Sequence, residues 1–485
     1  MSASDIDVLV IGAGPVGLVS ALALAQNGVS IRIVDKASNL NIGQRGSGLM
    51  PRSLEAYKFL GVLDDYVAKG SYHRFTMRTY DKDGKPIRDT TLSEDAPVTP
   101  EVPFPIPLTL GQDSNCAILR KYLKALGVEV ELETEMVTYV QDNSGVTATL
   151  KIGEREEKVR SKFLVGTDGA KGITRRTAGI HFQGKTEEDI KAVIGDVEIS
   201  DVHGSPNALE RSVLHAFTDE RQNRFMIRPV PEDPNVYFAF IGGPDIDNRR
   251  VMADLDYMHE WLRRLSHHPE LVVSKIYTIA EWRLNERVAD KFRAGRVLLA
   301  GDAAHCHSPT GGQGINSGVL DAMNISWKLT SVIKGCSPLT LLDTYEEERM
   351  PVIREMLRMT TDIADRTFKL NDPTAFSRPL ALRQLGVHYR WSSIIIDDLR
   401  EGDLILESTS VEPEDVYGNE TPDRLHAGDR APDAPELVNV KTSEDTQLSS
   451  SQRTTLSLSS ILRRSRTSSP SPPPILPPCS TSLPF

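Results

Sequence analysis

Two distant stretches of the chain show the same order of apolar strand, glycine-rich turn and helix. In the first, the consecutive apolar residues Val8 to Ile11 predict a parallel strand that is covered on both faces. A helix follows, with Pro15 in its first turn and Asn27-Gly28 at its end. A second apolar strand, Ile31 to Val34, completes a strand–turn–helix–strand unit.

The second stretch begins with the apolar residues Val297 to Ala300, which run directly into Gly301-Asp302. Beyond a glycine-rich loop, apolar residues recur every four positions at Ile315, Val319, Met323 and Trp327. This spacing predicts one buried stripe along a helix. The glycine-rich loop therefore also joins a strand to the N-terminus of a helix.

Between these stretches, residues 72–89 and 224–243 alternate in the manner of half-buried strands, and the second segment contains a Pro-Glu-Asp-Pro-Asn turn typical of a hairpin. After residue 440 the character of the chain changes. Residues 441–485 are dominated by Ser, Thr and Pro and show little periodicity. Because such a segment buries too little apolar surface to offset its ordering entropy, we predict a disordered tail.

Composition narrows the possible partners. With 485 residues, of which 39% are hydrophobic, the chain can bury a large core and form two or three domains. The net charge of −11 argues against a nucleic-acid partner. The polar N-terminus shows no signal peptide, and no apolar run reaches the roughly 18 residues of a membrane span. We therefore expect a cytoplasmic protein.

The first glycine cluster has the spacing Gly-x-Gly-x-x-Gly at Gly12, Gly14 and Gly17. Gly12 permits a tight turn, Gly14 lets the backbone approach a pyrophosphate, and Gly17 allows close packing of helix and strand. The helix N-terminus attracts phosphates, and Asp35 can accept hydrogen bonds from a ribose diol. Because Asp35 would repel a 2′-phosphate, the unit predicts binding of FAD or NAD rather than NADP.

The second junction predicts a different ligand group. Asp302 is unsuited to a phosphate but suited to accepting hydrogen bonds from a sugar-alcohol hydroxyl. The backbone N–H groups of Gly312 to Asn316 should point at an electron-rich group.

Three motifs together resemble those of the FAD-dependent aromatic hydroxylases, the single-component flavoprotein monooxygenases, in their phenol-hydroxylase-like branch. The motifs are the first glycine cluster, "VGTDGAKGITR" (165–175) and "GDAAHCHSPTGGQGINSGVLDAMNISWKL" (301–329). The resemblance covers roughly residues 5 to 435, and the third motif is highly specific. The second motif departs from the family pattern at Gly172, where a Ser is common.

The resemblance implies tightly bound FAD, with NADPH or NADH as a transient reductant and O2 as co-substrate. In the family cycle O2 adds to the reduced flavin at C4a, and the resulting hydroperoxide hydroxylates a phenolic or polyketide-derived aromatic ring. The residues that it assigns to cofactor binding are Gly12, Gly14, Gly17, Asp35, Arg45, Gly48, Arg52, Gln112, Asp168, Gly169, Asp302, Gly312, Gln313, Gly314, Ile315 and Asn316.

The residues that touch the substrate are less well defined. Trp282 stands where relatives carry an aromatic residue that faces the substrate, although core packing explains it equally well. Ser47 aligns with an Asp that phenol-hydroxylase relatives use as a base, and a Ser cannot replace it, so another group activates the substrate or the substrate arrives ionised. Arg228 and Tyr237 are further candidates, for which a solvated strand face is an equal explanation. No catalytic triad is required, and none is visible.

No metal site is expected, because His305 and His307 lie two residues apart on a loop without further ligands nearby; a structural role near the flavin is the better interpretation. The resemblance leaves a homodimer open. Two other functions also stay open: a flavin-binding relict without activity, and another FAD-dependent oxidoreductase such as a halogenase. The Trp-x-Trp pair of halogenases is missing.

The predicted fold class is α/β: a Rossmann-like FAD-binding domain with an inserted substrate domain built on a mixed or antiparallel sheet. The FAD-binding domain is expected at 1–72, 112–182 and 287–365, the substrate domain at 73–111 and 183–286. A helical or irregular connection at 366–440 would lead towards a thioredoxin-like domain that is missing here, and the disordered tail follows.

Overall fold

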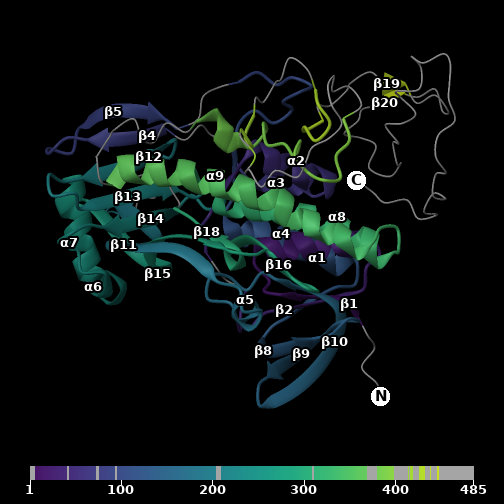
Figure 1. Cartoon of the computed structure of the whole chain (residues 1–485). Helices are drawn as coiled ribbons and strands as arrows, with labels where there is room; N and C mark the ends of the chain where they lie inside the picture. The colour runs from purple at the N-terminus through teal and green to yellow at the C-terminus, as the bar shows by residue number, and fades with distance from the viewer. Residues whose placement is uncertain are drawn as a thin grey trace.

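The computed structural model describes most of the chain. The described residues are 6–40, 43–72, 76–92, 96–201, 203, 209–308, 311–368, 379–397, 413, 415–418, 425–431, 437–438 and 445–446. Almost all of the predicted tail, 441–485, lies outside them. Figure 1 shows two groups of strands side by side, with long helices lying across them.

The first sheet contains the predicted strand–turn–helix–strand unit. Its central strands run parallel in the order β17-β10-β1-β2-β7, and an antiparallel hairpin extends β10. Its strands are β1 (Ile6–Ile11), β2 (Ile31–Val34), β7 (Val130–Glu131), β8 (Thr134–Gln141), β9 (Val146–Ile152), β10 (Arg155–Gly166), β16 (Arg293–Ala294) and β17 (Val297–Leu299).

Helices cover this parallel sheet and form the largest core with it. The predicted helix after the first glycine cluster is α1 (Pro15–Gln26), which packs against β2 and contacts α4 (Gln112–Ala125) and α8 (Gly314–Ile333). Further helices are α2 (Pro51–Phe59), α3 (Leu63–Lys69), α5 (Ile173–Thr177) and α9 (Asp343–Phe368). Short 3₁₀ helices lie at η1 (Gly301–Ala303), η3 (Leu339–Leu342) and η4 (Leu380–Arg383).

The second sheet is mainly antiparallel, with one parallel pair between β4 and β12. Its strands are β4 (Thr76–Tyr80), β5 (Pro86–Thr91), β11 (Phe182–Asp201), β12 (Val213–Thr218), β13 (Arg224–Pro229), β14 (Val236–Gly242), β15 (Leu271–Ala289) and β18 (His305–Cys306). Helices α6 (Asn248–Ala253) and α7 (Leu255–Ser266) cover its outer face and build a separate core with β11, β13 and β15.

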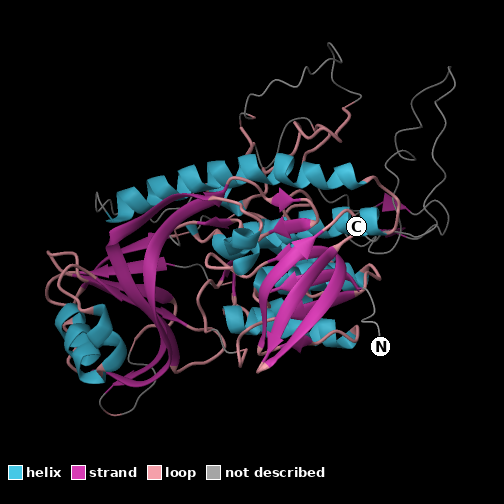
Figure 2. Ribbon diagram, turned by 60° about the horizontal axis from the view of Figure 1, so that its bottom comes forward, coloured by secondary structure: helices cyan, strands magenta, loops and turns pink. Residues whose placement is uncertain are grey.

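The longest strands of the structure lie in the second sheet. Strands β11 and β15 pair over nearly their whole length, and β18 adds to β15 through the pairs Arg287–Cys306 and Val288–His305. β3 (Gly48–Leu49) and β6 (Leu108–Thr109) form a separate, small antiparallel sheet. Figure 2 shows α9 lying across both β-layers.

The predicted fold class is confirmed: a parallel α/β unit carries a mixed, mostly antiparallel second sheet. The first sheet draws its strands from the segments predicted to bind the nucleotide, and the second from the inserted ones apart from the ends of β11 and β15 and the short β18. Near the C-terminus, β19 (Leu437–Val438) and β20 (Asp445–Thr446) form a two-stranded pair. Within the described part of the chain, no helix is long and apolar enough to cross a membrane.

The space around the glycines of the first turn leads to a prediction about stability. A Cβ at Gly17 would lie 2.0 Å from the carbonyl oxygen of Gly12, whereas a Cβ at Gly14 would meet nothing within 4 Å. We predict that Gly17→Ala lowers the free energy of unfolding by about 1–3 kcal/mol through overpacking. Gly14→Ala, at a φ of −69° that alanine adopts readily, should cost less than about 1 kcal/mol.

Urea unfolding of the two variants, followed by far-ultraviolet circular dichroism, compares them directly. Equal losses of stability in both variants would contradict the assigned packing role of Gly17.

Candidate functional site

One cavity of about 1040 Å³ extends between the two sheets and is lined by both glycine-rich junctions. Asp35 lines it at the end of β2, and Asp302 lines it just after β17. The two junctions, which the sequence predicts to converge on one nucleotide, therefore open into one cavity.

The first junction presents the N-terminus of α1 to this cavity. Gly12 has a φ of +102°, and a Cβ there would lie 2.5 Å from the carbonyl oxygen of Thr167. Gly14 is the N-cap residue of α1, with Pro15 next to it, and no side chain caps the helix. The Asp35 carboxylate accepts a hydrogen bond from the backbone N–H of Ala13 at 2.7 Å, which fixes the carboxylate beside the turn. Because uncapped N–H groups at a helix N-terminus attract anions, this end of the cavity suits a phosphate group.

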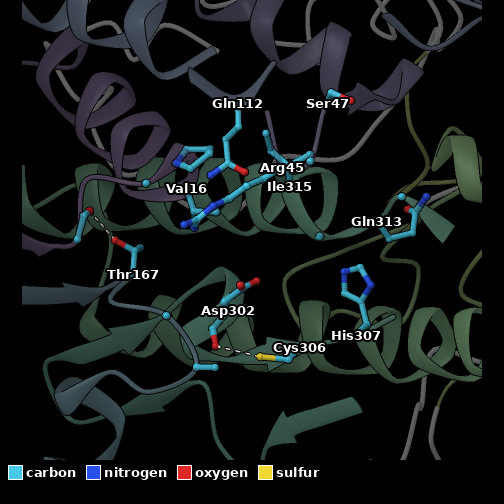
Figure 3. A pocket seen from close by; sticks show the side chains of 18 of the residues that line it. Val16, Arg45, Ser47, Gln112, Thr167, Asp302, Cys306, His307, Gln313 and Ile315 are labelled. Atoms are coloured by element: carbon cyan, nitrogen blue, oxygen red, sulfur yellow. Dashed lines mark hydrogen bonds between the residues drawn. The ribbon is translucent and has the colours of Figure 1, made fainter. Parts of the chain in front are cut away.

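The second junction places a carboxylate inside the cavity. The side chain of Asp302 projects into it below Arg45 and Gln112 (Figure 3). No described residue donates a hydrogen bond to the Asp302 carboxylate. Although the cavity leaves this side chain accessible, the surrounding protein limits its hydration and raises its pKa. Asp302 is thus a hydrogen-bond acceptor that no residue in the described part of the chain satisfies.

Arg45 and Gln112 face the cavity from the opposite side. Arg45 lies in the loop before β3 with a φ of +33°, a backbone conformation that is uncommon for a residue with a side chain. Gln112 is the first residue of α4. Both line the cavity.

Asp168 lies at the end of β10 and caps the next helix. Its Oδ2 accepts hydrogen bonds from the N–H and the hydroxyl of Thr174, both at 2.9 Å, while Oδ1 is buried without a partner among the described residues. Burial raises the pKa of Asp168. A Cβ at Gly172 would lie 2.3 Å from this carboxyl group. In this structure Asp168 therefore occupies the space that a side chain at position 172 would take.

A buried ionic cluster holds the loop after β17. The carboxylate of Asp321, on α8, accepts hydrogen bonds from His305 at 2.6 Å, from Arg349 at 2.8 Å and from the backbone N–H of Gly301 at 3.1 Å. All three side chains are almost completely buried. Burial alone would raise the pKa of Asp321, but His305 and Arg349 lower it to about 2. This cluster fixes Gly301-Asp302 against α8.

An apolar face of the second sheet forms the wall opposite the junctions. One register row crosses four strands, in which Met226 pairs with Phe240, Phe240 with Ile194, and Ile194 with Ala280; all four residues line the cavity. Trp282 also lines it, and its ring centroid lies 5.7 Å from that of Phe240.

Tyr237 lies on the other face of β14, and its prediction as a pocket residue is wrong. Side chains alternate between faces along a strand, so Phe238 and Phe240 line the cavity while Tyr237 points into the core against α7. The Arg211 guanidinium lies 4.9 Å from the Tyr237 ring centroid. The hairpin was predicted correctly, but the choice of face at Tyr237 was not.

Most of the predicted site residues line the one cavity. They are Gly12, Gly14, Asp35, Arg45, Ser47, Gly48, Gln112, Asp168, Gly169, Arg228, Trp282, Asp302, Gly312, Gln313, Gly314 and Ile315.

Three predicted cofactor residues do not line the cavity. Gly17 packs against Gly12, and Arg52 pairs with Glu55 at 2.6 Å. The side chain of Asn316 accepts from the N–H of Met50 at 2.7 Å and donates to the carbonyl oxygen of Gly48 at 2.9 Å. Asn316 therefore links the β3 loop to the N-terminus of α8. This contact lies behind the cavity wall and supports it.

Sequence reasoning missed part of the wall. Pro379, Leu380, Leu382 and Arg383, in the segment predicted as a mere connection, line the cavity. Gln384 holds this segment in place by donating to Gln313 Oε1 at 2.6 Å. No local pattern marks these residues, because only tertiary packing brings them to the site. His307 also lines the cavity, and its place in the third motif was the available signal.

Comparisons with known proteins identify the class. Residues 5–360 match the family described as "FAD binding domain". A flavin-dependent monooxygenase of Mycobacteroides abscessus is 34% identical over 433 residues, which cover 88% of this chain and 83% of that protein. Tetracenomycin A2 monooxygenase-dioxygenase of Streptomyces glaucescens is 31% identical over 436 residues, covering 81% of this chain and 73% of that protein.

A solved structure agrees with these relatives. The ternary complex of aklavinone-11 hydroxylase with FAD and aklavinone superimposes with a TM-score of 0.74 at 25% identity, covering 90% of this chain and 80% of that one. The chain belongs to the flavin-dependent aromatic monooxygenases that carry this FAD-binding domain. The predicted family and its cofactor, FAD, are confirmed.

The cavity fits this cofactor. It offers an uncapped helix N-terminus with free space at Gly14 and, in the same cavity, the Asp302 carboxylate, to which none of the described residues donates a hydrogen bond. A phosphate group suits the first and a hydroxyl donor the second, and FAD carries both.

The buried cluster around Asp321 yields a second prediction. Asp321→Ala would leave Arg349 and His305 buried without their shared acceptor, so we expect the free energy of unfolding to fall by about 3–5 kcal/mol at pH 7. Glu355→Ala removes an exposed ion pair with Arg358 and should cost less than about 1 kcal/mol.

The sign of the pH dependence follows from the lowered pKa. The pKa of Asp321 is about 2 in the folded chain and about 3.9 in the unfolded chain. The charge of Asp321 therefore stabilises the folded chain fully at pH values above about 4. The stability advantage of the wild type over Asp321→Ala should thus be complete at neutral pH and shrink as the pH falls from about 4 to about 2. Denaturant titrations across this range test it, and a constant difference would contradict the role of the Asp321 charge.

Proposed function

We propose that the protein is an FAD-dependent monooxygenase that uses NAD(P)H and O2 to hydroxylate an aromatic small molecule, phenolic or polyketide-derived. The observation that carries this proposal is the single cavity, which joins both glycine-rich junctions to an apolar, aromatic wall. Relatives that act on tetracenomycin A2 and aklavinone support the polyketide-derived class.

The residues of the two junctions would hold opposite ends of FAD. The N-terminus of α1 at Gly12 and Gly14 would bind the pyrophosphate, and Asp35 the adenosine ribose. Asp302 would accept a hydrogen bond from a ribityl hydroxyl, and the N-terminus of α8 would face the pyrimidine end of the isoalloxazine. The remaining residues proposed to surround the cofactor, directly or as support, are Gly17, Arg45, Gly48, Arg52, Gln112, Asp168, Gly169, Gly312, Gln313, Gly314, Ile315 and Asn316.

When bound, FAD supplies the redox chemistry: it takes electrons from NAD(P)H and activates O2 for insertion of one oxygen atom into the ring. The positive N-terminal end of the α8 helix would favour negative charge on the part of the cofactor held next to it. The apolar row from Met226 to Ala280 excludes water and orients the aromatic ring. Trp282 and Phe240 offer ring faces for stacking, and Arg228 provides a buried polar group on the same wall.

The presence of two sheets supports the assignment of cofactor binding and substrate binding to different segments of the chain. We propose that 1–72, 112–182 and 287–365 form the FAD-binding domain and 73–111 with 183–286 the substrate domain. The 366–440 connection would contribute to the site itself, since Pro379 to Arg383 line the cavity.

The role of Asp302 can be tested by cofactor retention. Asp302→Ala removes the acceptor for the ribityl hydroxyl, so we predict markedly lower FAD content after purification, measured as the ratio of flavin to protein absorbance. Asp343→Ala serves as a control because Asp343 forms an exposed ion pair with Arg293, outside the lining of the cavity. Normal FAD content in Asp302→Ala would reject the assigned role.

The activity itself is tested by screening phenolic compounds against the FAD-loaded protein. Stimulated NADPH or NADH consumption, with a product heavier by one oxygen atom, supports the proposal. A yellow protein whose NAD(P)H oxidation no aromatic compound accelerates would favour the flavin-binding relict.

A further inference from the structure

The loop that carries Arg45 is held by two carboxylates from different parts of the chain. The backbone N–H of Gly43 donates to Asp113 Oδ2 at 2.8 Å, and the N–H of Gln44 donates to Asp196 Oδ2 at 2.9 Å. Asp113 lies in the first turn of α4, beside the nucleotide-binding sheet, whereas Asp196 lies on β11 in the second sheet. The second sheet therefore contacts this loop through Asp196.

Asp196 is itself fixed in position. Its Oδ2 also accepts a hydrogen bond from the hydroxyl of Thr278, on β15, at 2.7 Å, and the residue is only 4% exposed. A Cβ at Gly43 would lie 2.5 Å from the same oxygen, so glycine lets the loop come this close. Because hydrogen bonds to a carboxylate are stronger than those between neutral groups, Asp196 holds the N–H of Gln44 firmly.

Asp196 lies between the cavity wall and the loop. On β11 it pairs with Phe238 and Thr278, in the row next to the apolar one on the same face of the sheet. Phe238 and its partner Arg228 line the cavity, whereas Asp196 does not. Burial raises the pKa of Asp196, and Arg228 is close enough for its charge to act against this. Asp196 thus has no contact with the cavity and can act on a ligand only through its neighbours.

Arg45 adopts a backbone conformation that depends on such support. A φ of +33° is uncommon for a residue with a side chain and persists only where neighbouring contacts impose it. The side chains of Arg45 and Asp302 extend into the cavity from opposite sides (Figure 3). Burial raises the pKa of Asp302, and the charges of His305 and Arg45 lower it. Arg45 therefore acts electrostatically inside the cavity, and its position follows from the backbone fixed at Gln44.

We propose that Asp196 is a positioning residue for the cofactor: by holding the N–H of Gln44, it sets where the Arg45 side chain lies in the cavity. The inference rests on the proposed function, in which Arg45 belongs to the surroundings of FAD, and it adds a residue of the second sheet to the support of the cofactor. No local sequence pattern marks Asp196, because the contact joins residues 152 positions apart.

The test measures how fast FAD leaves the purified, FAD-loaded protein. Release after dilution is followed by the rise in flavin fluorescence, which needs neither substrate nor turnover. Asp196→Ala removes the acceptor for Gln44, so we expect FAD to leave at least about fivefold faster than from the wild type. Asp196→Asn keeps an acceptor oxygen and should release FAD more slowly than Asp196→Ala.

A double-mutant cycle separates positioning from a general loosening of the fold. If Asp196 acts through Arg45, the effect of Asp196→Ala should largely disappear in a chain that already carries Arg45→Ala. Val197→Ala is the control, because Val197 is the next residue on β11 and is buried in the core on the other face. It should lower the free energy of unfolding but change the rate of FAD release by less than about twofold.

An unchanged release rate in Asp196→Ala or in Arg45→Ala would overturn the inference. So would additive effects in the double variant, or release from Asp196→Asn as fast as from Asp196→Ala. If Asp196→Ala does not fold, Thr278→Val replaces it. This variant removes one hydrogen bond to Asp196 and should speed release by a smaller factor, only in chains that retain Arg45; no effect would then overturn the inference.

Failure of the proposed function would look different. A purified wild type without FAD would overturn the proposed function and this inference together. If instead FAD is bound but no aromatic compound stimulates NAD(P)H oxidation, the proposed function fails, while the pattern of FAD release among the variants still decides the role of Asp196.

Discussion

The cavity depends on the close contact between α1 and α8. A Cβ at Gly318 would lie 2.4 Å from Val16 Cγ2, and one at Gly301 would lie 2.8 Å from the same methyl group. Only glycine at these two positions lets the start of α1 approach the loop after β17 so closely. Because both junctions meet around Val16, they open into one cavity and can share one extended ligand.

Buried charged side chains stabilise this contact between α1 and α8. Asp321 accepts hydrogen bonds from a loop N–H, from His305 and from Arg349, and so ties the loop after β17 to α8 and α9. Asn316 performs a similar task toward the β3 loop. The glycines that make the approach possible also leave the backbone without side-chain constraints. The buried polar network supplies rigidity that the glycine-rich loop lacks.

The junctions could be predicted from sequence because their signals are local. Strand, turn and helix lie within about thirty residues, and the glycine spacing marks the turn, at which Gly12 and Gly17 have steric reasons in the structure. Tyr237 shows where such reasoning ends: the alternation fixed two faces for β14, but it did not say which face meets the cavity and which meets α7. The wall at Pro379 to Arg383 had no local signal, since its position depends on contacts such as Gln384 with Gln313, 71 residues apart.

The distribution of polar groups divides the cavity into two chemical environments. At the junctions, helix N-termini and the carboxylates Asp35 and Asp302 suit a ligand that carries both phosphates and hydroxyls. Towards the second sheet, the row from Met226 to Ala280 is apolar, and burial lowers the pKa of Arg228 to about 10 while keeping it charged at neutral pH. This side of the cavity therefore offers an apolar surface with a buried cation, whereas the junctions offer helix N-termini and carboxylates, so the two halves suit chemically different groups.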